Sequence, residues 1–157
     1  MNQLLVVAEP QELQMAQQLF PNIPHLITGV GAINIIRALQ NLPKDTHIIN
    51  VGYAGSANFP ISSLVQVTSV ALNHPNVNYQ EPSLNCTPIT PNTNQPLLTA
   101  PCYTGVDFCL QSNYHDCVFD MELAFIAALD FKKLSSIKFV SDNLSLHDYH
   151  QLSNAVI

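Results

Sequence analysis

Charged residues are scarce in this sequence. Asp, Glu, Lys and Arg make up 10% of the 157 residues, against about 25% in an ordinary soluble domain. Hydrophobic residues make up 47%, so we expect a substantial core and some apolar surface that a partner covers, most simply a second copy of the chain. The net charge of −6 and the lack of any Lys/Arg cluster argue against nucleic acid or an anionic membrane as partner.

Paired cysteines, a leader segment and long apolar runs are missing as well. The four cysteines form no C-x-x-C pair, and we interpret them as reduced thiols. The first residues have neither the basic start nor the apolar length of a signal peptide, and no stretch of 18 apolar residues occurs. These observations predict one soluble, cytoplasmic domain spanning residues 1–157.

Apolar runs alternate with helical patterns along the chain. We expect strands at residues 3–7, 25–31, 64–72, 97–102, 117–119 and 137–140, a further strand from His47 that ends in a loop at Gly52 and Gly55, and helices at 10–20, 32–42, 121–134 and from His147. Prolines and asparagines break every period over residues 73–101, which predicts an irregular excursion. The alternation predicts an α/β three-layer sandwich with a central mixed, largely parallel sheet.

Two carboxylates, Glu122 and Asp142, follow neighbouring predicted strands. Ligands of open α/β sheets bind beyond the carboxyl ends of strands, so these acids are candidates for chemistry. The alternative for Asp142 is that it caps the following turn. Glu12 stands in the first turn of a predicted helix, where the helix dipole alone favours a carboxylate.

Glycine turns end the second and third predicted strands. Gly31 precedes a predicted helix and Gly52 follows an apolar run. Such turns form an anion cradle in some folds and serve only close packing in others. The spacing of His147 and His150 would suit a metal, but the sequence places no third ligand, so no metal is predicted.

Five short motifs taken in order resemble one family. They are residues 8–13 (AEPQEL), 28–31 (TGVG), 48–55 (IINVGYAG), 119–122 (FDME) and 140–142 (VSD). Together they resemble the nucleoside phosphorylase/nucleosidase superfamily, and most of all its bacterial methylthioadenosine/S-adenosylhomocysteine nucleosidases. The DME turn followed about twenty residues later by the SD strand end is the most specific element.

The resemblance implies a role for each matching residue. Asp142 would protonate the purine at N7, and Glu12 would hold the attacking water. Glu122 would bind the ribose hydroxyls, with Met121 against the sugar. Phe108 would stack on the base, and the backbone after Cys117 would read the edge of the base. Gly31, Gly52 and Ser141 would complete the substrate site. The resemblance implies no metal and no organic cofactor.

The chain also departs from the family pattern. The hairpin that the family usually has between Phe20 and His25 and the long C-terminal helix beyond His150 are expected to be missing or short. Tyr53 stands where the family has a small hydroxyl residue, and Ser145 follows Asp142 where a second Asp is usual.

The resemblance implies a purine nucleosidase, an N-ribosyl hydrolase of adenosine-type nucleosides such as methylthioadenosine, acting as a homodimer. A purine nucleoside phosphorylase is the first alternative, but the only arginine, Arg37, lies inside a predicted helix, and phosphate binding favours arginines. A degenerate relative that binds a nucleoside or a protein without turnover is the second alternative.

Overall fold

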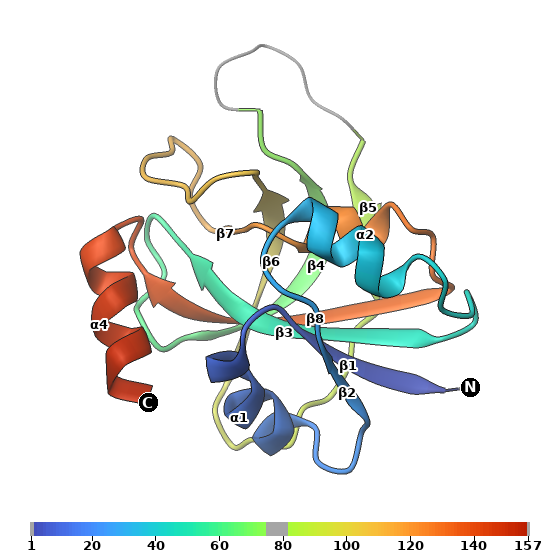
Figure 1. Ribbon diagram of the computed structural model, residues 1–157. Coiled ribbons are helices and arrows are strands. Elements are labelled where there is room, and N and C mark those ends of the chain that lie inside the picture. The colour runs from blue at the N-terminus through green and yellow to red at the C-terminus, as the bar shows by residue number, and fades with distance from the viewer. Residues whose placement is uncertain (1, 75–81, 157) are drawn as a thin grey trace.

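The computed structural model describes residues 2–74 and 82–156 (Figure 1). Strands and helices alternate in the first half of the chain, and strands predominate in the second. In chain order the elements are β1 (Gln3–Val7), α1 (Pro10–Leu19), β2 (His25–Ile27), α2 (Ala32–Leu39), β3 (His47–Gly55), β4 (Leu64–Leu72), β5 (Leu84–Asn85), β6 (Leu97–Thr104), β7 (Val118–Asp120), α3 (Leu123–Ala127), β8 (Lys133–Asp142) and α4 (Leu146–Val156).

Parallel pairing organises the first half of the sheet. β1 lies between β2 and β3, and β3 pairs with β8, all in parallel. The residues Leu5, Val6 and Val7 are fully buried, because helices cover both faces of a parallel sheet and its strands are apolar on both sides.

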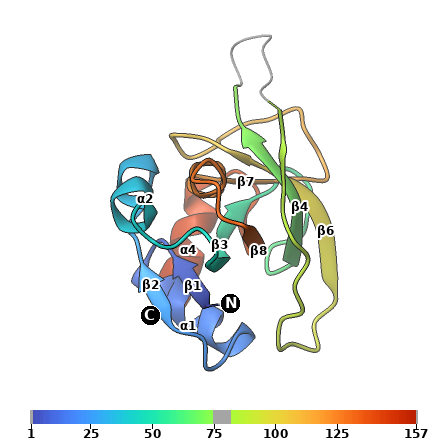
Figure 2. The ribbon, with the colours of Figure 1, turned by 90° about the vertical axis from the view of Figure 1, so that its right-hand side faces the viewer.

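The second half of the sheet closes into a ring. β8 pairs antiparallel with β4, β4 pairs parallel with β6, and β6 pairs parallel with β7. β7 then returns to β3 through the antiparallel pair of Gly55 and Phe119. Figure 2 shows β4 and β6 side by side in this half of the sheet. Gly55 is also the register partner of Asp142. The ring therefore brings the ends of β3, β7 and β8 to one place.

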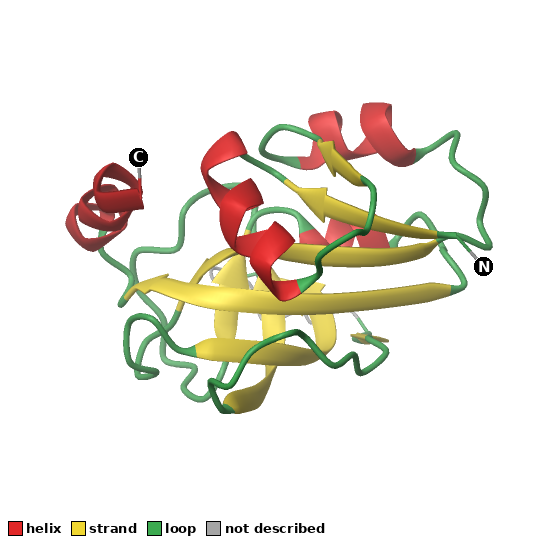
Figure 3. Ribbon diagram, turned by 90° about the horizontal axis from the view of Figure 1, so that it is seen from below, coloured by secondary structure: helices red, strands yellow, loops and turns green. Residues whose placement is uncertain are grey.

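Helices lie on both faces of the sheet (Figure 3). On one face α1 contributes Ala16 and Leu19 to a buried cluster with residues of β1 and β3. On the other face α2 and α3 pack in a second cluster around Leu39 and Leu123. The predicted sandwich with a mixed, largely parallel sheet is confirmed. The chain passes from α1 to β2 through residues 20–24 without a hairpin.

The predicted helix over residues 121–134 is mostly wrong. Only α3 is helical there, and β8 begins at Lys133. Asp130 takes a positive φ of 63°, a conformation that ends a helix rather than continues it. Leu134 fits the helical period of the sequence but pairs with Ile48 in the sheet. Tertiary pairing overrides the local pattern here, because a short apolar run suits helix and strand alike.

The predicted excursion over residues 73–101 is only partly irregular. β5 pairs antiparallel with β4 through residues 84 and 85, and β6 begins at Leu97. Between them, the Ile89 N–H donates to the side chain of Gln66 at 2.6 Å. Part of this prediction falls on residues 75–81, which lie outside the described residues.

Candidate active site

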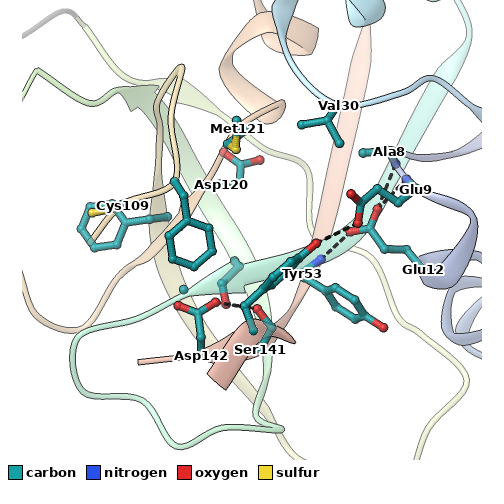
Figure 4. A pocket seen from close by; sticks show the side chains of 15 residues that line it. Ala8, Glu9, Glu12, Val30, Tyr53, Cys109, Asp120, Met121, Ser141 and Asp142 are labelled. Atoms are coloured by element: carbon teal, nitrogen blue, oxygen red, sulfur yellow. Dashed lines mark hydrogen bonds between the residues drawn. The ribbon is translucent and has the colours of Figure 1, made fainter. Parts of the chain in front are cut away.

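A cleft of about 170 Å³ opens where β3, β7 and β8 end (Figure 4). Glu9 and Glu12 lie on one side of it, Asp120 and Met121 on another, and Ser141 and Asp142 at a third. The cleft is lined by Ala8, Glu9, Glu12, Val30, Tyr53, Ala54, Gly55, Phe108, Cys109, Phe119, Asp120, Met121, Ser141, Asp142 and Tyr149. Four of these residues are acids and none is Lys or Arg, so the cleft favours neutral or cationic ligands.

Glu12 points into this cleft from the first turn of α1. Its side chain is 4% exposed. One carboxylate oxygen accepts the N–H groups of Ala8 (3.1 Å) and Glu9 (2.8 Å), and the other accepts the N–H of Tyr53 (2.7 Å). Burial raises the pKa of Glu12 to about 7, against the lowering effect of these N–H groups and of the Lys138 ammonium. A carboxyl poised near neutrality suits a general base.

Gly52 makes room for that carboxylate. A Cβ atom added at Gly52 would lie 2.8 Å from Oε2 of Glu12 and 3.5 Å from Nζ of Lys138. Only glycine allows this approach of backbone and carboxylate. Gly52 therefore contributes to the site by leaving room for the Glu12 carboxylate, although Gly52 itself does not line the cleft.

Asp142 ends β8 and is 1% exposed. Its Oδ2 accepts the hydroxyl of Ser141 (2.7 Å), and its Oδ1 accepts the N–H of Leu144 (2.9 Å). Burial raises the pKa of Asp142, while these two hydrogen bonds oppose the shift. Asp142 therefore caps the following turn with one oxygen and still lines the cleft, so the two interpretations of this residue are compatible.

Glu122 lies just behind the cleft wall, immediately before α3. Its side chain is 8% exposed, and its Oε2 accepts the N–H of Gly31 at 3.2 Å. Gly31 has φ 89°, a conformation that glycine adopts readily. Burial, and then the charge of Asp120, raise the pKa of Glu122 to about 8. Glu122 and Gly31 thus meet, while the neighbouring Met121 and Val30 line the cleft.

A buried ion pair supports the turn that carries Glu122. Nζ of Lys138 lies 2.9 Å from Oδ2 of Asp120, and Lys138 is fully buried. Asp120 also accepts the Thr104 hydroxyl and, at 2.9 Å, the Leu123 N–H. Burial raises the pKa of Asp120, but Lys138 and these donors outweigh it and hold the pKa below its ordinary value. The ion pair joins β7 to β8 beneath the site.

Aromatic rings surround the mouth of the cleft. Phe108 lines it and meets the ring of Tyr149 at 5.6 Å in a T-shaped contact. The ring of Tyr53 packs against Phe139 at 5.9 Å, and its hydroxyl reaches the Gln11 carbonyl at 3.5 Å. Tyr53 therefore forms a side of the cleft and leaves its volume open.

Four further residues with polar or reactive side chains line the cleft and were not predicted from the sequence: Glu9, Cys109, Asp120 and Tyr149. Asp120 belongs to the same motif as Glu122, and Cys109 follows Phe108. Both could therefore have been predicted as cleft residues from their position next to predicted site residues. Nothing in the sequence indicated that Tyr149 reaches Glu9, because 139 residues separate them. The segment after Cys117 reaches the cleft at Phe119, whereas Cys117 itself is 2% exposed and does not line the cleft; the cysteine that does is Cys109.

Within residues 2–74 and 82–156, no group of three or more His, Cys, Asp or Glu side chains is arranged to hold a metal ion. No helix in that part of the chain is long and apolar enough to span a membrane.

The closed mixed sheet with helices on both faces is the fold of the nucleoside phosphorylase/nucleosidase superfamily, as solved structures of its nucleosidases show. A methylthioadenosine/S-adenosylhomocysteine nucleosidase (MTAN) from Chlamydia trachomatis was solved with adenine bound. Its structure matches this one with a TM-score of 0.74 and 26% sequence identity, and the match covers 100% of this chain and 90% of that one.

More distant structures share the fold. A putative 5′-methylthioadenosine/S-adenosylhomocysteine nucleosidase from Borrelia burgdorferi has a TM-score of 0.75 and 19% identity, covering 99% of this chain and 94% of that one. A futalosine hydrolase mutant of Helicobacter pylori has a TM-score of 0.74 at 13% identity, covering 99% and 91%. No protein-family model and no curated protein sequence matches the chain.

Proposed function

We propose that this protein is a purine nucleosidase that hydrolyses the N-ribosidic bond of adenosine-type nucleosides such as methylthioadenosine. The observation that carries the proposal is that Glu12 and Asp142, both buried, face one open cleft from different elements. The likeness to nucleosidases, two of them solved with adenine bound, supports the same class of reaction.

The proposed reaction uses one carboxyl as acid and one as base. Asp142 donates its proton to N7 of the base as the bond between C1′ and the base breaks. Glu12 accepts a proton from water as the water oxygen bonds to C1′. The products are the free base and the free sugar, and proton exchange with solvent restores both carboxyls. Buried acids with raised pKa values suit this division of roles.

Glu122 is proposed to bind the ribose hydroxyls. In its ionised form it would accept hydrogen bonds from the 2′ and 3′ hydroxyls, beside Met121 at the sugar face. Because Met121 lines the cleft and Glu122 does not, we expect the Met121 side chain to shift when the sugar enters. Phe108 is proposed to stack on the base, since an aromatic ring and a purine face pack favourably.

Water is favoured over phosphate as the nucleophile. Phosphate binding needs cations that face the ligand. No Lys or Arg lines the cleft, and the ammonium of Lys138 is fully buried against Asp120. The acid-lined cleft would repel a phosphate dianion.

Incubation with adenosine, methylthioadenosine and inosine tests the proposal. Free base should appear without phosphate, and added phosphate should not increase the rate. Base release that requires phosphate would favour the phosphorylase. Nucleoside binding without any base release would favour the binding protein that does not turn over its ligand.

We also propose that the protein acts as a homodimer. Apolar side chains at the β2–α2 corner are exposed: Ile27 (39%), Val30 (38%), Ile33 (69%) and Ile36 (42%). Val30 also lines the cleft, so a second copy covering this corner would complete the wall of the site. We therefore propose that a second copy of the chain covers the β2–α2 corner.

A further inference from the structure

Glu9 lines the cleft but has no role in the hydrolysis as proposed. It stands directly before α1 and is partly buried. Its Oε2 accepts the hydroxyl of Tyr149 at 2.8 Å and the side-chain amide of Gln11 at 2.7 Å. Donors from α4 and from α1 therefore hold this carboxylate in place at the cleft wall.

The partner of Glu9 extends across the mouth of the cleft. The ring of Tyr149 contacts Phe108 at 5.6 Å and Tyr53 at 6.3 Å, both in edge contacts, while its hydroxyl reaches Glu9. We call Glu9 together with Tyr149 the Glu9–Tyr149 wall. One end of this wall lies beside Phe108, the ring proposed to stack on the base, and the other end is the carboxylate of Glu9.

The orientation of a nucleoside against this wall follows by elimination and rests on the proposed function. With the base between Phe108 and Asp142, and the 2′ and 3′ hydroxyls toward Glu122, one substituent of the furanose remains, the group at C5′. The N–H of Glu9 donates to Glu12 at 2.8 Å, so Glu9 adjoins the carboxylate beneath C1′. The C5′ group is then the part of the ligand that meets the Glu9–Tyr149 wall.

We propose that the Glu9–Tyr149 wall determines substrate specificity by selecting nucleosides with a hydrogen-bond donor at C5′, so that adenosine is preferred over methylthioadenosine. A carboxylate has about four acceptor positions, and the two donors on Glu9 leave capacity for a 5′-hydroxyl. An alkylthio group offers no donor and would desolvate the remaining acceptor positions of the carboxylate without filling them. A 5′-phosphate would meet like charge, since the cleft contains acids and no lining cation.

Binding to an Asp142→Asn variant tests this preference without turnover. Adenosine should bind at least about tenfold more tightly than methylthioadenosine, because a hydrogen bond to a charged group contributes a factor of roughly 10 to 150. Adding Glu9→Met, which keeps the length of the side chain, should remove or reverse this ratio. Adding Tyr149→Phe should weaken the preference by a smaller factor, since Glu9 remains.

Gln11→Met is the matched control. It removes the other donor to Glu9, but Gln11 does not line the cleft, so the affinity ratio should change less than about threefold. Circular dichroism spectra and thermal midpoints of all variants should match the parent, which separates a change of specificity from misfolding.

The outcomes distinguish this inference from the proposed function. If the wild-type protein releases base but methylthioadenosine binds as tightly as adenosine, or Glu9→Met leaves the ratio unchanged, only the role of the Glu9–Tyr149 wall is overturned. If neither nucleoside binds and no base is released, the proposed function and the inference are both overturned.

Discussion

At the scale of single residues, Glu12 and Asp142 need opposite protonation states in the same reaction. The base must begin ionised and the acid protonated. Burial raises the pKa of both carboxyls, that of Glu12 to about 7, and hydrogen-bond donors oppose the rise at both. The proposed roles therefore rest on where the two carboxyls stand in the cleft, and each role can be tested separately.

Replacing the proposed acid should stop base release while the fold remains. In Asp142→Asn the amide oxygen can still accept the Leu144 N–H, but no proton is available for the base. We expect kcat to fall by about 10²–10⁴-fold, measured as free adenine, with an unchanged thermal midpoint. Full activity in this variant would exclude Asp142 as the acid.

The pH profile should report Glu12. Its pKa is raised to about 7, so below that pH it is protonated and cannot accept a proton from water. We expect kcat/KM to rise with pH up to about 7, approximately tenfold per pH unit on the acid side. Glu12→Gln should lose most activity together with this limb. An acid limb near the ordinary pKa of glutamate, or one that persists in Glu12→Gln, would contradict the assignment.

At the scale of elements, the ion pair of Lys138 and Asp120 connects β7 with β8. The long pairing of β3 with β8 places Lys138 beside Gly52, and the pairing of β6 with β7 places Asp120 near Thr104. Both charged groups are almost completely buried. The turn carrying Met121 and Glu122 follows Asp120 directly, so this ion pair positions the proposed sugar-binding residues.

Removing one member of the pair should therefore be costly. Lys138→Met leaves a buried carboxylate without its cation, and we expect the free energy of unfolding to fall by about 3–5 kcal/mol in urea titrations. The double variant Asp120→Asn with Lys138→Met should recover part of that loss, because no charge is then left unpaired. A decrease in the free energy of unfolding of less than about 1 kcal/mol in the single variant would show that the ion pair does not stabilise the sheet.

At the scale of the whole molecule, buried acids link stability to pH. The folded protein holds the protons of Glu12 and Glu122 up to about pH 7 and 8, whereas the unfolded chain releases them near pH 4.5. The unfolded state therefore gains stability as pH rises through this window. The thermal midpoint should be higher at pH 5 than at pH 8, by several degrees, as measured by scanning calorimetry.

A matched variant separates this effect from general charge repulsion. Glu122→Gln removes one of the two carboxyls whose pKa is raised by folding. The thermal midpoint of this variant should therefore fall less between pH 5 and pH 8 than that of the wild-type protein. Replacing Asp45, an exposed acid, by Asn should leave the fall unchanged. A midpoint that rises toward pH 8 in the wild-type protein would contradict the link.

The proposed homodimer is also tested on the whole molecule. Light scattering coupled to gel filtration should give twice the chain mass of 17.3 kDa. Ile33→Glu, at the most exposed position of the β2–α2 corner, should shift the protein toward the monomer, because a charge would be buried at the interface. The control Leu98→Glu changes an exposed apolar residue on β6, 38% exposed, and should leave the mass unchanged. A monomeric wild-type protein would reject the proposal.

The sequence by itself determined the elements whose local pattern is strong. The apolar run of Gln3–Val7, Pro10 at the start of α1, the start of β3 and the strand β4 lie where predicted, since burial on both faces and fixed backbone angles act within a few residues. β3 continues to Gly55, although a loop was predicted from Gly52. Motifs at strand ends also indicated Glu12, Glu122 and Asp142 as candidates, and of these Glu12 and Asp142 line the cleft, together with two acids that were not predicted, Glu9 and Asp120.

Only the tertiary structure decided how these parts meet. Leu134 became part of a strand because β3 offered a parallel partner along its whole length. The closed ring joined Gly55 to both Phe119 and Asp142, and it buried Lys138 against Asp120. Tyr149 reached Glu9 across the cleft. Such contacts depend on packing between segments far apart in the chain, and no local pattern specifies which distant side chain a residue meets.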